Sequence, residues 1–272
     1  MRRKRAIVPT VLAAGLLILV LHPFLWLILS TFKNESDIVQ YPPTFFAGRY
    51  TFLQYIKVWE SIPLLNFICN TVIYAGSVVV ISSIVDSMAG YAFARIKFKF
   101  RNQLFVVILI SMMIPSQVLM IPLFLEEHKL GILNSYAGLI LPKAADAFGI
   151  FLMRAFFTSL PKELEEAARI DGLDEFRILF VIMFPLCIPG VLTCAVFNFV
   201  GNWNDLLYPL LMTSSAEMRT LSAGLAMFVG DRTIEYGPTL AASFISLVPL
   251  ILIYIFGQKY FVQSFATAGI KG

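Results

Sequence analysis

Charged residues are scarce in this sequence, making up 14% of its 272 residues, whereas soluble domains average roughly 25%. The hydrophobic fraction is 58%, and the mean hydropathy is +0.80. No soluble fold of this length could bury so much apolar surface, so a soluble globular protein is excluded. Apolar runs of about 20 residues cross the ~30 Å hydrocarbon layer as helices. The composition therefore predicts an all-α integral membrane protein.

Residues that carry metal, redox or catalytic chemistry are equally few. Cys69, Cys187 and Cys194 lie in apolar runs without a CxxC pair, and His22 and His128 are far apart in the sequence. We interpret the cysteines as small buried hydrophobes and expect no metal site. The sequence also lacks a GxxxxGK[ST] loop, so we expect the chain to bind no ATP or other cofactor itself and not to be an enzyme.

Apolar stretches long enough to cross a bilayer occur along the whole chain. Six are predicted, over residues 7–31, 66–94, 103–125, 136–158, 178–200 and 239–261. The first is longer than a signal-peptide core and no small-residue cleavage site follows it, so we expect it to be retained. Prolines inside the later stretches predict kinked or broken helices, which are common in transporters.

The distribution of Lys and Arg predicts the orientation in the membrane. If the N-terminus is cytoplasmic, the inner segments carry 14 of these cations and the longer outer segments carry 7. Cytoplasmic loops are enriched in positive charge. We therefore expect both termini to face the cytoplasm, together with the segment around residues 159–177.

Charge is concentrated in one short segment of this apolar chain. A charge at the centre of a bilayer costs at least about 2.5–3.5 kcal/mol, so the segment must lie outside the membrane. Its nine charged residues are Lys162, Glu163, Glu165, Glu166, Arg169, Asp171, Asp174, Glu175 and Arg177.

The same segment has the signals of a helix, a glycine turn and a second helix. Thr158, Ser159 and Pro161 are typical of a helix start, Gly172 favours a left-handed stop, and Asp174 can cap the second helix. An apolar face is predicted from Leu160, Leu164, Ala167 and Ala168. The residues alone leave two interpretations open, a solvated loop or a docking element whose small alanines admit a partner.

A motif in this segment resembles the EAA motif of binding-protein-dependent ABC import permeases. Glu166, Ala167 and Ala168 are followed at the family's spacing by Gly172 and then by the sequence IMFP at residues 182–185, in which Phe184 replaces the usual leucine. Further segments resemble the carbohydrate-uptake branch, and the pattern is most similar to the second, shorter permease of maltose-type systems. These segments cover residues 90–102, 113–124, 130–142, 202–211 and 258–272.

The resemblance implies a fold, a function and partners. The fold would be that of a type I ABC importer permease, with a terminal helix and external loop over 1–65, a transmembrane core over 66–261 and a cytoplasmic tail over 262–272. The chain would pair with a second permease and import a sugar, an oligosaccharide or a polyol phosphate. Two ATPase subunits would bind ATP and Mg, and an external sugar-binding protein would deliver the cargo to the loops at 33–65 and 202–238.

The resemblance also implies which residues receive the work of ATP hydrolysis. A coupling helix over about 161–172 would enter a groove on the ATPase, and the tail at 268–272 would approach that interface or simply fray. The expected coupling residues are Glu165, Glu166, Ala167, Ala168, Asp171 and Gly172.

Polar residues within or beside the spans are candidates for a substrate path or an outer gate. Asp86 is an intramembrane acid, which is a functional candidate by default, although it could instead meet water or pair with a lysine. The remaining candidates could equally anchor the chain at the interface or bond helices together. They are Asn70, Tyr74, Asn202, Trp203, Asn204 and Asp205.

The main alternative from the residues is a secondary transporter driven by an ion gradient. Such proteins often carry several buried acids or histidines and show paired repeat halves. This sequence offers only Asp86 and His22 for that role and has no visible repeat. The sequence does not predict which sugar is carried.

Overall fold

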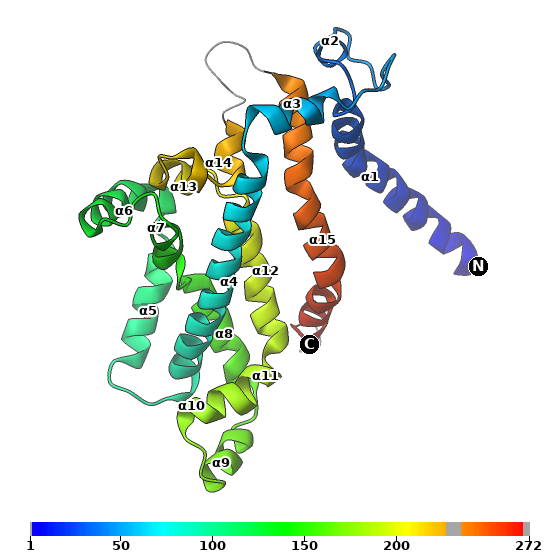
Figure 1. Ribbon diagram of the computed structural model, residues 1–272. Coiled ribbons are helices and arrows are strands. Elements are labelled where there is room, and N and C mark those ends of the chain that lie inside the picture. Colours follow the sequence, from blue (N-terminus) through cyan, green and yellow to red (C-terminus); the bar gives the residue numbers. More distant parts are fainter. Residues whose placement is uncertain (1, 227–234, 269–272) are drawn as a thin grey trace. The chain divides into compact units, whose positions relative to one another are not determined.

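The computed structural model describes residues 2–226 and 235–268, with side chains over residues 9–226 and 235–255. Every regular element in these ranges is helical (Figure 1). The first elements are α1 (Arg2–Ser30), α2 (Glu35–Ile38), α3 (Leu53–Ser61), α4 (Leu64–Arg95), α5 (Arg101–Ser111), α6 (Ser116–Leu130), α7 (Tyr136–Ile140), a 3-10 turn (Leu141–Lys143) and α8 (Ala147–Ser159). The remainder are α9 (Glu163–Ile170), α10 (Glu175–Arg177), a π-helical turn (Ile178–Met183), α11 (Phe184–Leu186), α12 (Ile188–Trp203), α13 (Leu207–Met212), a 3-10 turn (Ala216–Met218), α14 (Leu221–Leu225) and α15 (Tyr236–Ala268).

Single helices provide three of the membrane spans. They are Pro9–Ser30 in α1, Leu64–Arg95 in α4 and Tyr236–Ile255 in α15, and each is long and apolar enough to cross a bilayer. These helices confirm the first, second and sixth predicted spans as uninterrupted helices.

Bent helix pairs replace the third, fourth and fifth predicted spans. The pairs α5–α6, Tyr136–Lys143 with α8, and Glu175–Leu186 with α12 are bent by 100°, 43° and 81° at their breaks. Six spans result if each pair counts as one. Proline accounts for the breaks, because Pro115, Pro142 and Pro189 lie at or beside them and cannot donate a backbone hydrogen bond.

The chain divides into two compact units. The first comprises the chain up to Leu64 and the beginning of α15, as far as Pro249. Within it, the Glu35 carboxylate accepts hydrogen bonds of 2.8 Å from the backbone N–H groups of Tyr236 and Gly237. A carboxylate at a helix N-terminus satisfies free donors and complements the helix dipole, so Glu35 fixes the start of α15.

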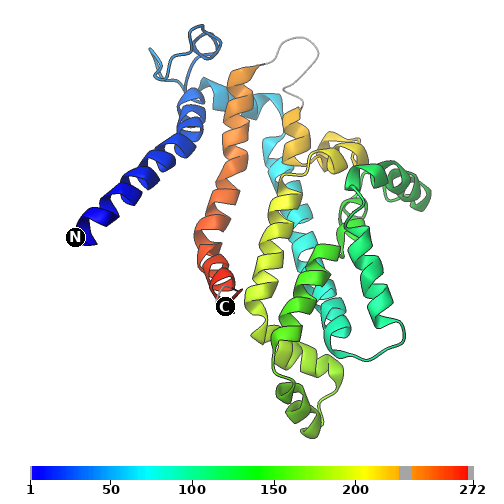
Figure 2. The same ribbon diagram turned by 180° about the vertical axis from the view of Figure 1, so that it is seen from behind.

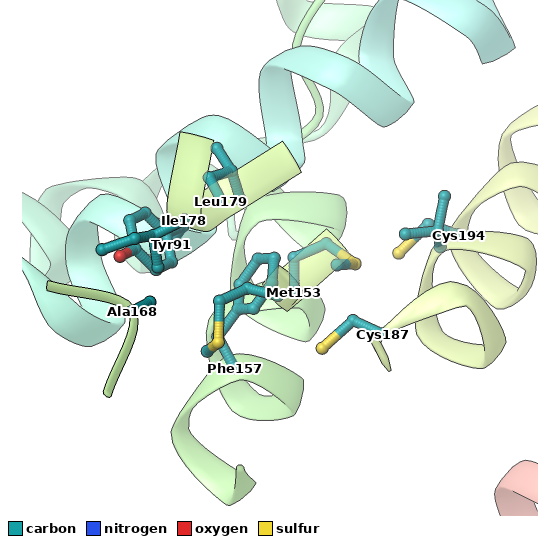
Figure 3. Close-up of a cluster of buried hydrophobic side chains, with 10 residues drawn as sticks. Tyr91, Met153, Phe157, Ala168, Ile178, Leu179, Cys187 and Cys194 are labelled. Atoms are coloured by element: carbon teal, nitrogen blue, oxygen red, sulfur yellow. The ribbon is translucent and has the colours of Figure 1, made fainter. Parts of the chain in front are cut away.

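The second unit runs from Leu65 to Ala223 and takes in α15 from Leu250. One buried apolar cluster joins α4, α8, α9, the π-helical turn and α12 (Figure 3). Cys187 and Cys194 belong to this cluster, which confirms their interpretation as buried hydrophobes, whereas Cys69 on α4 is exposed. The cluster's members are Tyr91, Met153, Phe157, Ala168, Ile178, Leu179, Met183, Cys187, Val191 and Cys194.

Helix α4 extends along the length of the second unit. In both views α9 lies near one end of α4, whereas α13 and α14 lie near its other end (Figures 1 and 2). A second buried cluster, which includes Tyr74, Val78 and Leu139, packs α4 against α7 and α13. One straight helix therefore contacts both ends of this unit.

Candidate functional site

The charged segment forms α9, a helix within the range predicted from the sequence. Its first turn carries Glu163, Glu165 and Glu166, which suits the positive end of a helix dipole. The predicted start signal is wrong, because α8 continues to Ser159 and the hydroxyl of Ser159 donates back to the Phe156 carbonyl. Thr158 and Ser159 therefore end α8 instead of starting α9.

The glycine turn after α9 forms as predicted. Gly172 has a φ of +80°, the conformation that glycine adopts at little cost. Its N–H donates to Arg169 O (3.1 Å) and the Leu173 N–H donates to Ala168 O (3.0 Å), which is the Schellman pattern of helix termination. The Asp174 carboxylate then caps the next helix by accepting from the Arg177 N–H at 2.8 Å. The turn is thus closed by hydrogen bonds at both sides.

The predicted coupling residues divide between two faces of α9 and the turn after it. Glu165 and Ala168 are buried, whereas Glu166 and Ala167 are exposed, as is Asp171 just beyond the helix. The four members of the predicted apolar face are divided, because Ala168 is buried and Leu160 is half-buried against the same cluster, whereas Leu164 and Ala167 are exposed. The outward face instead adds Ile170, whose side chain is 86% exposed.

A chain of charged contacts links the buried side of α9 to α4. The Arg95 guanidinium lies 3.0 Å from the Glu165 carboxylate, and Glu165 also lies 3.5 Å from Arg169. Arg169 pairs with Glu175 at 2.8 Å, and Glu175 accepts a 2.7 Å hydrogen bond from the Tyr91 hydroxyl. The contacts begin and end on α4, so they form a closed ring, which we call the Arg95 ring.

The second candidate site is a cavity of about 880 Å³ in the second unit, within the roughly 300–1,000 Å³ range of small-molecule sites. The elements that line it include α6, α8, α12 and α13. Its polar lining residues include Gln117, Lys143, Asp146, Asn198, Asn202, Asn204 and Asp205, and its aromatic ones are Phe148, Phe197 and Tyr208. Amides beside aromatic rings can hydrogen-bond and stack against a polyhydroxylated ligand.

The charges in this cavity are paired or used as helix caps. Lys143 lies 2.7 Å from Asp205 and 4.7 Å from the ring centre of Tyr208. The Asp146 carboxylate accepts from the Gly149 N–H at 3.0 Å. A cation that is already paired is a weak attractor for an anionic ligand, so the geometry favours a neutral polar ligand.

The polar residues predicted from the sequence lie in different places. Asn202, Asn204 and Asp205 line the cavity. Tyr74 lies behind them and donates to Asn202 at 2.9 Å. Trp203 is only 1% exposed and stacks on Phe199 with ring centres 5.3 Å apart.

Asn70 and Asp86 are buried outside the cavity lining. The Asn70 amide donates to the carbonyls of Glu217 and Arg219 and accepts from the Tyr136 hydroxyl, so it joins three segments. Asp86, on α4, lies beside the N-terminal end of α8, where it accepts a hydrogen bond from the backbone N–H of Asp146. Asn70 therefore makes the kind of bond between segments that the sequence left as an alternative. Asp86, which is fully buried, bonds to the backbone instead of meeting water or pairing with a lysine.

Sequence reasoning missed several residues of both sites. Asn198 lies four residues before Asn202, so the two share a face of an otherwise apolar helix, and this spacing could have identified the lining. Phe148 and Phe197 gave no signal among so many phenylalanines. Arg95 contributed to the predicted orientation, but its role in the ring depends on residues 70 to 80 positions away, which no local pattern shows.

A membrane bundle with an outlying amphipathic helix and a cavity that carries polar groups in a largely apolar wall has the architecture of a transporter subunit. The chain belongs to the family described as the binding-protein-dependent transport system inner membrane component, whose model matches residues 86–266. This match covers α9, its turn and the cavity. The chain is therefore a permease of an ABC importer and a transport component.

Relatives and a solved structure agree with this family. The arabinooligosaccharides transport system permease protein AraQ of Halalkalibacterium halodurans is 36% identical over 253 residues, covering 92% of this chain and 91% of the relative. The trehalose/maltose transport system permease protein MalG of Thermococcus litoralis is 32% identical over 261 residues, covering 94% and 93%. A crystal structure of a bacterial ABC transporter involved in the import of the acidic polysaccharide alginate matches with a TM-score of 0.84 and 26% identity, over 95% of this chain and 97% of that one.

Proposed function

We propose that this chain is one of two permease subunits that import a carbohydrate under the drive of two separate ATPase subunits. The observation that carries the proposal is the outward face of α9, formed by Glu166, Ala167 and Ile170, beside a turn closed by hydrogen bonds. A short helix that is closed by a hydrogen-bonded turn and contacts its neighbour transmits a displacement, whereas a flexible loop absorbs it. ATP and Mg would bind to the partner ATPases, and this chain would bind no cofactor.

The cavity is the proposed path of the sugar through this subunit. Its amides and aromatic rings suit hydroxyl groups, and its cation is paired with Asp205. The names of the relatives support a carbohydrate, since they include transport proteins for arabinooligosaccharides, lactose and trehalose or maltose. The second permease would close the path from the other side.

The proposed orientation places both termini and α9 in the cytoplasm. The excess of Lys and Arg in those segments supports it. The loops at 33–65 and 202–238 would then face outward and receive a sugar-binding protein, although residues 227–234 of the second loop lie outside the described residues. The proposed contact of the tail with the ATPase also lies outside them for residues 269–272.

Reconstitution tests the proposal directly. The complex is purified through a tag on this chain, its ATPase activity is measured, and the binding protein is tested against arabinotriose, lactose, trehalose, maltose and diacetylchitobiose. The sugar that binds is then used for uptake into proteoliposomes with ATP or with an ion gradient alone. Glu166→Lys is compared with Glu60→Lys, because both carboxylates are exposed on short helices.

We expect an ATPase to copurify and uptake to require ATP. Glu166→Lys should lose the ATPase, whereas Glu60→Lys should retain it. Uptake driven by an ion gradient without ATP would contradict the proposal and support a secondary transporter. Binding of none of the five sugars, with uptake of another solute, would contradict the carbohydrate assignment.

A further inference from the structure

Arg95 ends α4 and contacts two other elements at once. Its guanidinium donates to the carbonyls of Phe157 (3.1 Å from Nε) and Leu160 (2.5 Å from Nη2). These carbonyls belong to the last turn of α8 and the residue after it, where helix carbonyls lack an intrahelical partner. The same guanidinium lies 3.0 Å from Glu165 on α9, so one side chain joins α4, α8 and α9.

The geometry of this junction suits positioning more than stability. The side chains of Arg95 and Glu165 are each only 5% exposed. The desolvation of such a buried pair offsets much of its Coulomb energy, but its geometry is specific because several acceptors must align with one planar fork. The Arg95 ring closes on Tyr91, one turn earlier on α4. Two successive turns of α4 therefore contact the charged segment, the Arg95 turn through Glu165 of α9 and the Tyr91 turn through Glu175 of α10.

The other end of α4 contacts the cavity. Tyr74 lies 21 residues before Arg95, which is about 30 Å along a helix. Its hydroxyl donates to Asn202 at 2.9 Å and lies 3.3 Å from Asp205, and both of these residues line the cavity. A displacement of the Arg95 end of α4 thus reaches the cavity without passing through the helices that adjoin α9 in sequence.

We propose that Arg95 is a positioning residue that locks α9 onto α4, so that α4 carries the displacement of α9 to the Tyr74–Asn202 contact. The inference rests on the proposed function, in which an ATPase moves α9. The competing route is covalent, through α8 on one side and the π-helical turn on the other. The proposed route requires the Arg95 ring, whereas the covalent route persists when the ring is broken.

The test is a double-mutant cycle in the complete transporter, reconstituted in proteoliposomes with its binding protein. The readout is the number of sugar molecules imported per ATP hydrolysed, with whichever of the five sugars named above the binding protein binds. Arg95→Lys keeps the charge but loses the planar fork, and Glu165→Gln keeps the shape but loses the charge. Arg101→Lys is the matched control, because the Arg101 guanidinium donates to the Ile96 carbonyl in the loop just before α5.

We expect each single variant to lower the sugar-to-ATP ratio by about 2- to 30-fold, with ATP hydrolysis and thermal stability retained. The double variant should be no worse than the more severe single variant, and Arg101→Lys should match the wild type. A wild-type ratio in assembled Arg95→Lys or Glu165→Gln would overturn the inference. If Arg95→Lys does not assemble, Glu165→Gln decides alone.

Failure of the proposed function would look different. In that case the wild-type complex would show no ATP-driven uptake, before any variant is measured.

Additive losses in the double variant would also overturn the inference, because they would mean that the two residues act independently instead of through one ring.

Discussion

Asp86 accepts a hydrogen bond of 2.9 Å from the backbone N–H of Asp146, so a carboxylate on α4 binds the residue that precedes α8. Asp146 in turn caps α8 through its own side chain. The bent helix pair formed by Tyr136–Lys143 and α8 is broken at this point. An unpaired backbone N–H inside a bilayer is costly. Asp86 therefore supplies the acceptor that the break in the helix requires.

Removing the Asp86 carboxylate should reduce stability and leave the sugar path intact. We expect Asp86→Ala to lower the free energy of unfolding by about 1–2 kcal/mol through loss of the acceptor, whereas Asp86→Asn, which keeps an oxygen, should cost less. Thermal unfolding in detergent and the KM for uptake measure the two effects. A raised KM with unchanged unfolding would instead assign Asp86 to the path.

Gly149 should not tolerate a side chain. A Cβ at this position would lie 2.1 Å from an oxygen of Asp86, so Gly149→Ala must displace the carboxylate or α8. We expect a loss of about 1–3 kcal/mol of stability from this overpacking.

The matched control for this prediction is Gly76→Ala on α4, where nothing lies within 4 Å of the added Cβ. Alanine in a helix is favoured over glycine by about 1 kcal/mol, so this variant should unfold at or above the wild-type temperature. Equal unfolding temperatures for the two variants would contradict the packing at Gly149.

Substitutions of Gly172 should reduce stability because of its backbone conformation, and not because an added side chain would clash with neighbouring atoms. Nothing lies within 4 Å of a Cβ at this position, but its φ is +80°. Gly172→Val should therefore cost about 1–2 kcal/mol through backbone conformation and uncouple ATP hydrolysis from uptake while the chain still inserts. Gly172→Asn should be milder, because asparagine adopts this conformation more readily. Uptake per ATP measures both, and unchanged uptake in Gly172→Val would contradict the prediction.

The stability contribution of Glu165 should depend on pH. Burial raises its pKa above the usual 4.5, and Arg95 and Arg169 oppose this shift only in part. The folded chain thus binds this proton more tightly than the unfolded chain. Glu165 stabilises the fold below pH 4.5 and loses that contribution as the pH rises through its raised pKa.

Glu165→Gln should therefore unfold at or above the wild-type temperature at neutral pH. As the pH falls toward 4.5, the unfolding temperature of the wild type should rise relative to that of the variant. The unfolding midpoints of both proteins across this range measure the difference. A variant that is less stable at neutral pH would mean that the ion pair holds the fold together.

The sequence predicted local features well because they depend on neighbouring residues. The left-handed turn at Gly172 and the cap at Asp174 follow from residue type and spacing, and both are present. The start of α9 was wrong because Thr158 and Ser159 bond back to α8. Which face of α9 is buried depends on the Arg95 ring, so an acid at position 165 points inward while Ala167 points out.

The cavity could be predicted only in part. Asn202, Asn204 and Asp205 were predicted from their position at the outer end of the fifth span, and they line the cavity. Lys143 and Phe148 reach the cavity because Pro142 and the following break redirect the chain. The direction of a broken helix is set by tertiary packing, so these residues could not be assigned from sequence.

Arg95 also acts in the order in which the chain is made. It leaves the ribosome 62 residues before Phe157, whose carbonyl it binds in the finished fold. In the proposed orientation it is during that interval a cation at the cytoplasmic end of a newly inserted span, where positive charge retains a segment on the cytoplasmic side. The same side chain would thus serve first as a topology signal for the nascent helix and afterwards as the contact that holds segments that are synthesised later.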